Sequence, residues 1–171
     1  MNDPRAILQE GIEALKAYTR WSKENQPDLM TVSVSRLDLL AATQTLVNEG
    51  WYLSAITGLH LPGASTVPAG EKQWMRTATE IDAQAGPPVE EDSFLVLYQF
   101  CKSNATLSLR VHPPSLEDAE VPSICGIIPS ATLYERELIE MFGLSVANTP
   151  DTTHFILPDD WPAGVYPLRK E

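Results

Sequence analysis

Two neighbouring segments with strand-like hydrophobic patterns constrain this fold more than any other feature of the chain. Residues 94–101 are apolar on both faces, which is typical of a central strand. After a turn at 102–105, residues 106–112 alternate strictly between apolar and polar side chains. The two sets are Leu107, Leu109 and Val111 on one side and Thr106, Ser108, Arg110 and His112 on the other. The pattern predicts an antiparallel hairpin with one solvated face.

Helical periodicity on either side of the hairpin completes a mixed pattern. A capping residue followed by proline, with apolar residues at helical spacing, predicts a helix near 4–20. Branched and aromatic residues predict strands at 29–35 and 51–61, with a helix between them that ends at Gly50. A further helix is predicted over 130–142. This order predicts an α+β fold in which helices pack on a mostly antiparallel sheet, with an extended C-terminal tail.

The chain divides into a predicted domain and a predicted interaction segment. Its 171 residues, 43% of them hydrophobic, suffice for one domain with a long extension. We expect an α+β domain over 1–145 that carries a long proline- and glycine-rich loop or insertion at about 62–91. Residues 146–171 are predicted to be an extended C-terminal interaction segment.

Charge and cysteine content exclude several classes of function. With 12 basic and 23 acidic residues the formal charge is −11, which argues against nucleic acid and against a basic membrane-docking patch. The acidity fits either simple solubility or an acidic docking face. Two cysteines, Cys101 and Cys125, cannot ligate a Cys₄ iron–sulfur or zinc site, and no nucleotide-binding loop occurs. We therefore expect no cofactor, no signal peptide, no membrane span and a cytoplasmic location.

The predicted helix at 130–142 carries its charges in an uneven pattern. Laid out at 100° per residue, it has one core-facing arc of large side chains. These are Leu133, Tyr134, Leu138, Met141 and Phe142. Arg136 and Glu140 fall together outside the arc as a solvated pair of a few tenths of a kcal/mol, and Glu135 falls at its edge. Ser130, or Thr132 in a capping box with Glu135, is expected to cap the helix.

Glu137 falls within the apolar arc and is the unusual residue of this helix. A carboxylate in that position needs a cationic or hydrogen-bonding partner, because burying it alone is costly. Either Glu137 leans out to water at the margin of the arc, or it pairs with a cation. That cation would come from another protein chain, or from Arg169 or Lys170 of this chain. Gly143 is expected to end the helix in a left-handed conformation.

The segment after this helix has the composition of a surface that another protein covers. Residues 157–162 read Leu-Pro-Asp-Asp-Trp-Pro and residues 166–171 read Tyr-Pro-Leu-Arg-Lys-Glu. Bulky apolar and charged groups separated by prolines are not expected to bury themselves against a single helix. Trp161 is a candidate interface anchor, since tryptophan is enriched at such positions.

At these residues the chain resembles the family of the thirty-kilodalton (30 kDa) subunit of respiratory complex I, the NADH–quinone oxidoreductase. The family motif is E-R-E-x-x-D/E followed by two apolar residues and glycine, which the stretch from Glu135 to Gly143 matches. A second motif, P-L-R-K-D, is matched by Pro167-Leu168-Arg169-Lys170, with Glu171 in place of aspartate. The match is specific over about 120–171 and looser before it.

Part of the segment departs from the complex I pattern. Residues 149–154 lack the first histidine and the two basic residues that the family usually carries there. Residues 157–166 look closer to the related subunits of membrane-bound energy-converting hydrogenases and formate hydrogenlyase. The resemblance therefore spans both kinds of complex.

The resemblance implies a structural role without a redox centre. It implies a subunit of the peripheral arm that docks on the large catalytic subunit, beside a small iron–sulfur subunit, at the inner face of the membrane. It also implies a set of residues that contact a partner. We add Trp161 to this set because tryptophan is enriched at interfaces. The set is Glu135, Arg136, Glu137, Trp161, Pro167, Leu168, Arg169 and Lys170.

Two other classes of function compete with this role. An enzyme or magnesium site would use Glu137, Asp159 and Asp160, although Asp159-Asp160 between proline and tryptophan is more simply a turn. A free-standing protein-binding paralogue would fit the missing basic pair near His154. We therefore expect no catalytic residue in this chain.

Overall fold

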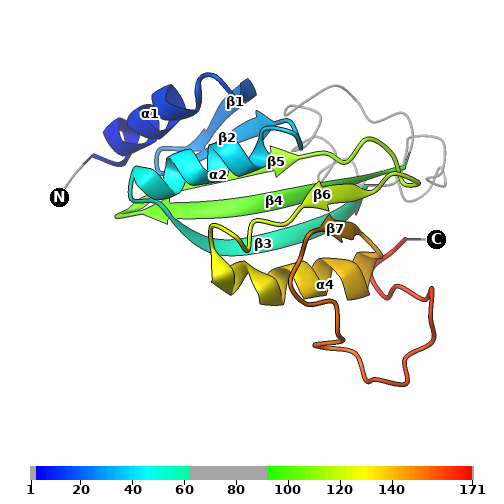
Figure 1. The fold of residues 1–171 in the computed structure, drawn as a ribbon. Coiled ribbons are helices and arrows are strands. Elements are labelled where there is room, and N and C mark those ends of the chain that lie inside the picture. Colours follow the sequence, from blue (N-terminus) through cyan, green and yellow to red (C-terminus); the bar gives the residue numbers. More distant parts are fainter. Residues whose placement is uncertain (1–2, 62–91, 171) are drawn as a thin grey trace.

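The structure is a computed structural model that describes residues 3–61 and 92–170. A five-stranded sheet forms its centre (Figure 1). The strands are β1 (Thr19–Gln26), β2 (Leu29–Val34), β3 (Tyr52–Leu61), β4 (Ser93–Lys102) and β5 (Ala105–Val111). The loop or insertion expected at 62–91 lies outside the described residues.

The sheet is antiparallel except at one junction. Its strand order is β1-β2-β5-β4-β3, and only β2 and β5 run parallel to each other. The predicted hairpin is β4–β5, in which Tyr98 pairs with Leu109 and, on the other side, with Ile56. The predicted α+β class with a mostly antiparallel sheet is therefore confirmed.

Three α-helices of the described residues pack on one face of the sheet (Figure 1). They are α1 (Pro4–Leu15), α2 (Leu39–Asn48) and α4 (Thr132–Phe142). Two glycines let helix and sheet approach closely. A Cβ at Gly11 of α1 would lie 2.8 Å from the Trp51 ring, and one at Gly58 of β3 would lie 2.7 Å from the Phe142 ring. The core therefore lies between α1, α2 and α4 and the helix-facing side chains of β3, β4 and β5.

Strand β1 differs from the expected extension of the first helix. The helix ends at Leu15, and residues 19–26 pair with β2 through the turn at Pro27-Asp28. The strand is an edge strand with charged and polar side chains, so it shows little hydrophobic period. Pairing with β2, rather than local sequence, fixes its conformation.

The polar side of β5 is less solvated than its alternation predicts. Ser108 and Arg110 are both 5% exposed, whereas His112 is exposed. The strand lies between β2 and β4 and is not the outer strand of a hairpin. Its polar side chains therefore sit among those of two neighbouring strands.

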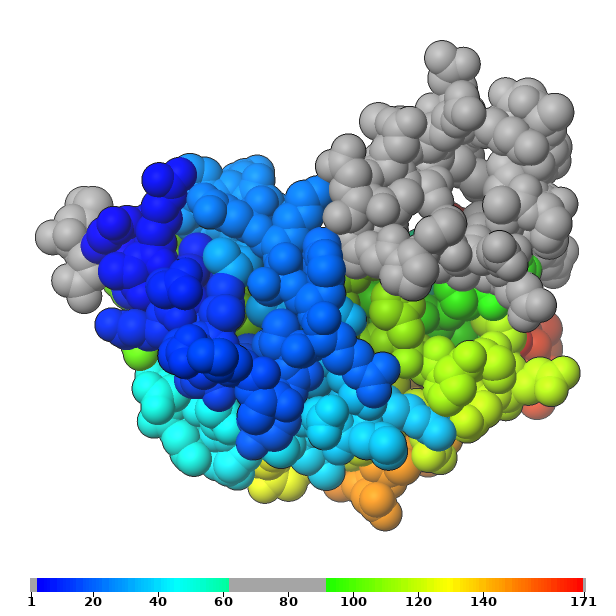
Figure 2. Space-filling model, turned by 90° about the horizontal axis from the view of Figure 1, so that it is seen from above, coloured from blue at the N-terminus to red at the C-terminus, as the bar shows by residue number. Residues whose placement is uncertain are grey.

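A short second sheet leads into and out of α4. The strands β6 (Glu120–Pro122) and β7 (Ser145–Ala147) pair in parallel, with α4 between them in sequence. Residues 148–170, which we call the carboxy-terminal segment, contain no helix or strand. The segment forms a loop that leaves the body of the molecule and returns to the end of α4 (Figure 1). Seen from above, residues of the amino-terminal third (blue to cyan) cover the left and centre of the molecule. Residues of the carboxy-terminal segment (orange to red) are visible only at the edges (Figure 2).

Candidate interface on helix α4 and the carboxy-terminal segment

Helix α4 begins and ends by backbone geometry. A 3₁₀ turn, Pro129–Ala131, leads into it, and the N-cap Ala131 makes no side-chain cap bond, so neither expected cap is formed. The Thr132 hydroxyl instead donates to the Pro129 carbonyl. Gly143 ends the helix with φ 67°, and its N–H donates to the Ile139 carbonyl at 2.9 Å. The left-handed end predicted for Gly143 is confirmed.

Glu135 is a buried carboxylate whose partners lie in the connection before the helix. Its oxygens accept hydrogen bonds from the Ile124 N–H at 2.8 Å, the Ser123 hydroxyl at 2.8 Å and the Cys125 thiol at 3.1 Å. Burial, first among several causes, raises the pKa of the Cys125 thiol and keeps it a donor at neutral pH. Glu135 thus fixes residues 123–125 beneath α4, where a connector was expected.

The buried side of α4 is rotated relative to the predicted arc. Leu133, expected in the core, is 48% exposed, and Glu135, expected at the edge, is 2% exposed. Glu137 is half-buried, and within the described residues its carboxylate makes no hydrogen bond or ion pair. The predicted arc took only the hydrophobicity of each residue into account. The polar groups at 123–125 satisfy the Glu135 carboxylate and so make its burial favourable.

Glu140 binds the carboxy-terminal segment to the outer side of the helix. Its carboxylate accepts from three successive backbone amides, those of Phe155, Ile156 and Leu157, at 2.9–3.2 Å. The His154 ring lies 3.4 Å away. Burial acts to raise the pKa of Glu140, but the three amides and His154 outweigh it and hold the pKa below 4.5.

Arg136 holds the start of the same segment. Its guanidinium donates to the carbonyls of Thr153 at 2.8 Å and His154 at 2.6 Å, and lies 3.4 Å from the Asp151 carboxylate. The side chain also stands over the Phe155 ring at 5.2 Å. The expected Arg136–Glu140 pair is not formed, because each side chain binds the segment instead of its helical neighbour.

Arg169 and Lys170 bring the far end of the segment back to α4. Arg169 donates to the Phe142 carbonyl at 2.7 Å, which satisfies the last turn of the helix and places a cation at its negative end. The Leu168 N–H donates to the Met141 carbonyl at 3.0 Å. The Lys170 N–H donates to His60 Nδ1 at 2.8 Å. Neither cation pairs with Glu137.

A turn and a side-chain hydrogen bond, both made by Trp161, hold the middle of the segment together. The Trp161 N–H donates to the Pro158 carbonyl at 3.0 Å, which confirms the turn expected at Asp159-Asp160. The Trp161 indole donates to the Val165 carbonyl at 2.8 Å. Pro167 is exposed near the return to α4. Trp161 therefore holds the loop together and is only partly available to a partner.

Large apolar side chains stand exposed around these anchored points. Five of the eight most exposed large hydrophobic residues of the described chain belong to α4 or to the carboxy-terminal segment. They are Leu133, Phe155, Ile156, Val165 and Leu168. Together with Glu137, these residues are the set that we call the α4 face. The backbone beneath them is fixed by hydrogen bonds, so the face is preorganised.

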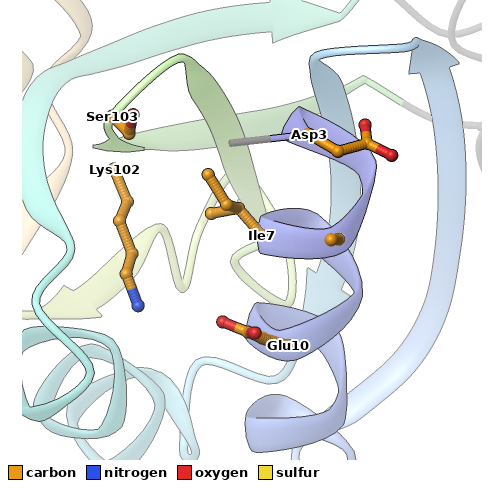
Figure 3. Close-up of a pocket in the computed structure, with 6 residues that line it drawn as sticks. Asp3, Ile7, Glu10, Lys102 and Ser103 are labelled. Atoms are coloured by element: carbon orange, nitrogen blue, oxygen red, sulfur yellow. The ribbon is translucent and has the colours of Figure 1, made fainter. Parts of the chain in front are cut away.

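A separate hollow of about 300 Å³ lies between α1 and the β4–β5 turn (Figure 3). Lys102 and Glu10 reach into it from opposite sides, and Ile7 supplies an apolar wall. No predicted site residue lines it. The described residues contain no group of three or more histidine, cysteine or acidic side chains that could hold a metal ion. No helix among them is both long and apolar enough to cross a membrane.

The fold and the α4 face define a class of protein before any comparison. It is a small α+β protein in which one charged helix organises a long carboxy-terminal segment at the surface. The family model of the respiratory-chain NADH dehydrogenase 30 Kd subunit matches residues 32–171. The chain therefore belongs to this family.

Similar proteins are named as subunits of two kinds of complex. The membrane-bound hydrogenase subunit beta of Pyrococcus furiosus is 31% identical over 110 residues, which cover 58% of this chain and 63% of that protein. An NADH-quinone oxidoreductase subunit of Rhizobium rhizogenes is 36% identical over 84 residues, 49% of this chain and 41% of that protein. The matches thus span less than two thirds of either relative.

A solved structure has the same fold over nearly the whole chain. It is a chain of the membrane-bound sulfane sulfur reductase, an archaeal respiratory membrane complex, with a TM-score of 0.67. The match covers 97% of this chain and 83% of that one at 15% sequence identity, which shows a shared fold.

Proposed function

We propose that this chain is a non-redox scaffold subunit of a membrane-associated oxidoreductase complex of the NADH-quinone oxidoreductase type. It docks on the large catalytic subunit and lies next to a small iron–sulfur subunit, peripheral to the inner face of the membrane. The observation that carries the proposal is the α4 face. In this set of residues the apolar side chains are exposed on backbone held by hydrogen bonds, and the Glu137 carboxylate is unpaired within the described residues.

Some motif residues make contacts within the chain and others do not, and this difference supports docking through the α4 face. Glu135, Arg136 and Arg169 are occupied by contacts within the chain. They position the face, whereas Glu137 and the apolar side chains remain available to a partner. A partner surface that fits would be apolar with one basic side chain placed to meet Glu137.

Relatives in longer polypeptides give further support. The match to an NADH-quinone oxidoreductase subunit of Chromohalobacter salexigens covers 50% of this chain but 14% of that protein. In such a relative the matched region is part of a much larger polypeptide. This arrangement supports the proposal that the matched region has protein neighbours.

A hydrogenase-type complex is the second candidate for the host assembly. The 110-residue match to a membrane-bound hydrogenase subunit is longer than the 84-residue match to the Rhizobium rhizogenes protein. In that case the large subunit would carry cysteine pairs of the kind that bind nickel and iron. Mass spectrometry of the native assembly identifies the large subunit and so decides between the two hosts.

Co-purification tests the scaffold role against the other classes. A scaffold is recovered with a large catalytic subunit and an iron–sulfur subunit and shows no turnover alone. Turnover by the isolated chain would favour an enzyme with its own active site. Recovery from native membranes as a monomer without partners would favour the free-standing paralogue and would contradict the proposal.

Substitution of Glu137 tests the docking face itself. We expect Glu137→Gln to weaken binding to the large subunit by about 2 kcal/mol, or roughly thirtyfold, because the partner's cation loses its counter-charge. Glu49→Gln is the matched control, since Glu49 is an exposed carboxylate beyond the end of α2. Equal affinities for the two variants would show that Glu137 is not a contact.

A further inference from the structure

We propose that His60 is a proton-sensitive latch that holds the end of the carboxy-terminal segment against the fold. The imidazole is 6% exposed and lies on β3, beneath the returning residues 166–170. It is joined to that segment by one hydrogen bond that can form only while Nδ1 of the ring carries no proton.

The hydrogen bond fixes the tautomer of His60. The Lys170 backbone N–H can only donate, so Nδ1 must accept with its lone pair and carry no proton. A neutral ring therefore has its proton on Nε2. Nε2 is buried and has no hydrogen-bond partner among the residues that the structure describes.

Protonation of the ring is incompatible with the latched geometry. An imidazolium carries N–H groups at both nitrogens, so Nδ1–H would face the Lys170 N–H at 2.8 Å. It would also leave two buried donors without acceptors, which is costly for a charged group. The ring must stay neutral or the segment must move away.

The surroundings of His60 favour the neutral ring. Burial lowers the pKa of His60 below 6.5, and the charges of Arg169 and Lys170 lower it further, while Asp92 acts in the opposite direction. The ring packs on Phe94 with centroids 5.0 Å apart, and Arg169 stands over the same Phe94 ring. The latch thus joins the segment's end to the aromatic core under α4.

The sign of the effect follows from the lowered pKa. The released state binds the proton more readily, so the latched state is fully favoured above pH 6.5 and loses its advantage as the pH falls below that value. Between 6.5 and the pKa of the latched ring, the latch opens about tenfold more often for each pH unit. Opening also frees the Arg169 side chain from the end of α4.

A second consequence rests on the proposed function. Leu168 belongs to the α4 face, and its backbone is held by the same returning segment. A partner that binds the latched form would therefore bind more weakly at acid pH. By linkage, its binding would lower the pKa of His60 by a matching amount.

The test uses the isolated full chain, so it does not depend on any partner. Nitrogen NMR of His60 should show protonated Nε2 and unprotonated Nδ1 at pH 7.5. Hydrogen exchange, corrected for the intrinsic rate, should show the amide protection of Lys170 and Leu168 falling together as the pH is lowered to 5.0. His60→Gln should keep its protection over this range, because the Gln carbonyl can accept from Lys170 without titrating.

His154→Gln is the matched control, because His154 is the other histidine in contact with the segment's anchors and lies next to Glu140. It should leave the pH dependence at Lys170 intact. Protonated Nδ1 at pH 7.5, or the same pH dependence in His60→Gln, would overturn the latch. If the isolated chain unlatches as expected but the affinity of the co-purified large subunit does not change with pH, the docking role of the segment fails and the latch stands.

Discussion

Two buried glutamates in one motif perform different structural tasks. Glu135 binds the connection before α4, and Glu140 binds the segment that follows it. Each carboxylate accepts several hydrogen bonds, so each is satisfied although it is only 2–5% exposed. At the residue scale these two motif carboxylates therefore bind other parts of the same chain.

Replacement of Glu135 by glutamine should destabilise the free chain. A Gln amide offers one acceptor oxygen and an NH₂ group in place of two acceptors, so at least one of the donors at residues 123–125 is left unpaired. We expect a loss of about 1.5–3 kcal/mol in the free energy of unfolding, measured by urea denaturation. Glu137→Gln is the control at about 0.5 kcal/mol or less, and equal losses would refute the assignment.

Replacement of Glu140 by alanine should free the amides of residues 155–157 while the sheet stays folded. Because the pKa of Glu140 is lowered in the folded chain, its contribution is present above pH 4.5 and is lost as the pH falls through the folded-state value. Hydrogen exchange should show wild-type protection at Phe155 and Ile156 falling on acidification. The variant should lack protection at every pH, and retained protection at neutral pH would contradict the assignment.

The helix periodicity of the sequence located α4 but not its orientation. The span 130–142 and the glycine at its end are predicted correctly, because they depend on local pattern and backbone conformation. The buried side is not, because Glu135 is satisfied by residues 123–125, which lie outside the helix in the preceding connection. The hydrophobicity of a residue does not include the hydrogen-bond partners that the fold brings to it. Strand β1 was missed for the same kind of reason, since β2 fixes it.

The end of α4 offers a test at the scale of an element. Gly143→Ala should cost more than the roughly 1–2 kcal/mol of a left-handed residue, because a Cβ there would lie 2.5 Å from the Tyr166 ring. Gly50→Ala is a matched control, since Gly50 has φ 80° but no atom within 4 Å of a Cβ. The difference in unfolding free energy isolates the contact with Tyr166. No difference would mean that the segment does not pack on the helix end.

On the scale of the whole molecule, the residues that form the core are largely separate from those that stand exposed on the carboxy-terminal segment. The core lies between the sheet and the three helices, whereas the carboxy-terminal segment attaches to α4 largely by polar contacts. Its apolar side chains can therefore stay exposed without disrupting the core. The sequence alone predicted a segment of this composition and a surface role for it; its route back to α4 could not be predicted, because the anchors lie up to 110 positions apart.

Ile156→Ser and Leu168→Ser should distinguish docking from folding. Both side chains are about half exposed, so each substitution should change the unfolding free energy by no more than about 1 kcal/mol. Each should weaken binding of the co-purified large subunit about tenfold, as removal of a buried apolar contact does. Leu37→Ser, at an 83% exposed position before α2, should leave binding unchanged. Loss of binding in all three variants would point to a general defect.

The sequence by itself determined the class of fold, the span of α4, its glycine end and the family. These follow from hydrophobic period, backbone preference and motif, which are properties of neighbouring residues. The tertiary structure decided which glutamates are buried, what Arg136 and Arg169 bind, and how His60 meets Lys170. Those features depend on hydrogen bonds between distant segments, and a charged group is buried only where such partners have been brought to it.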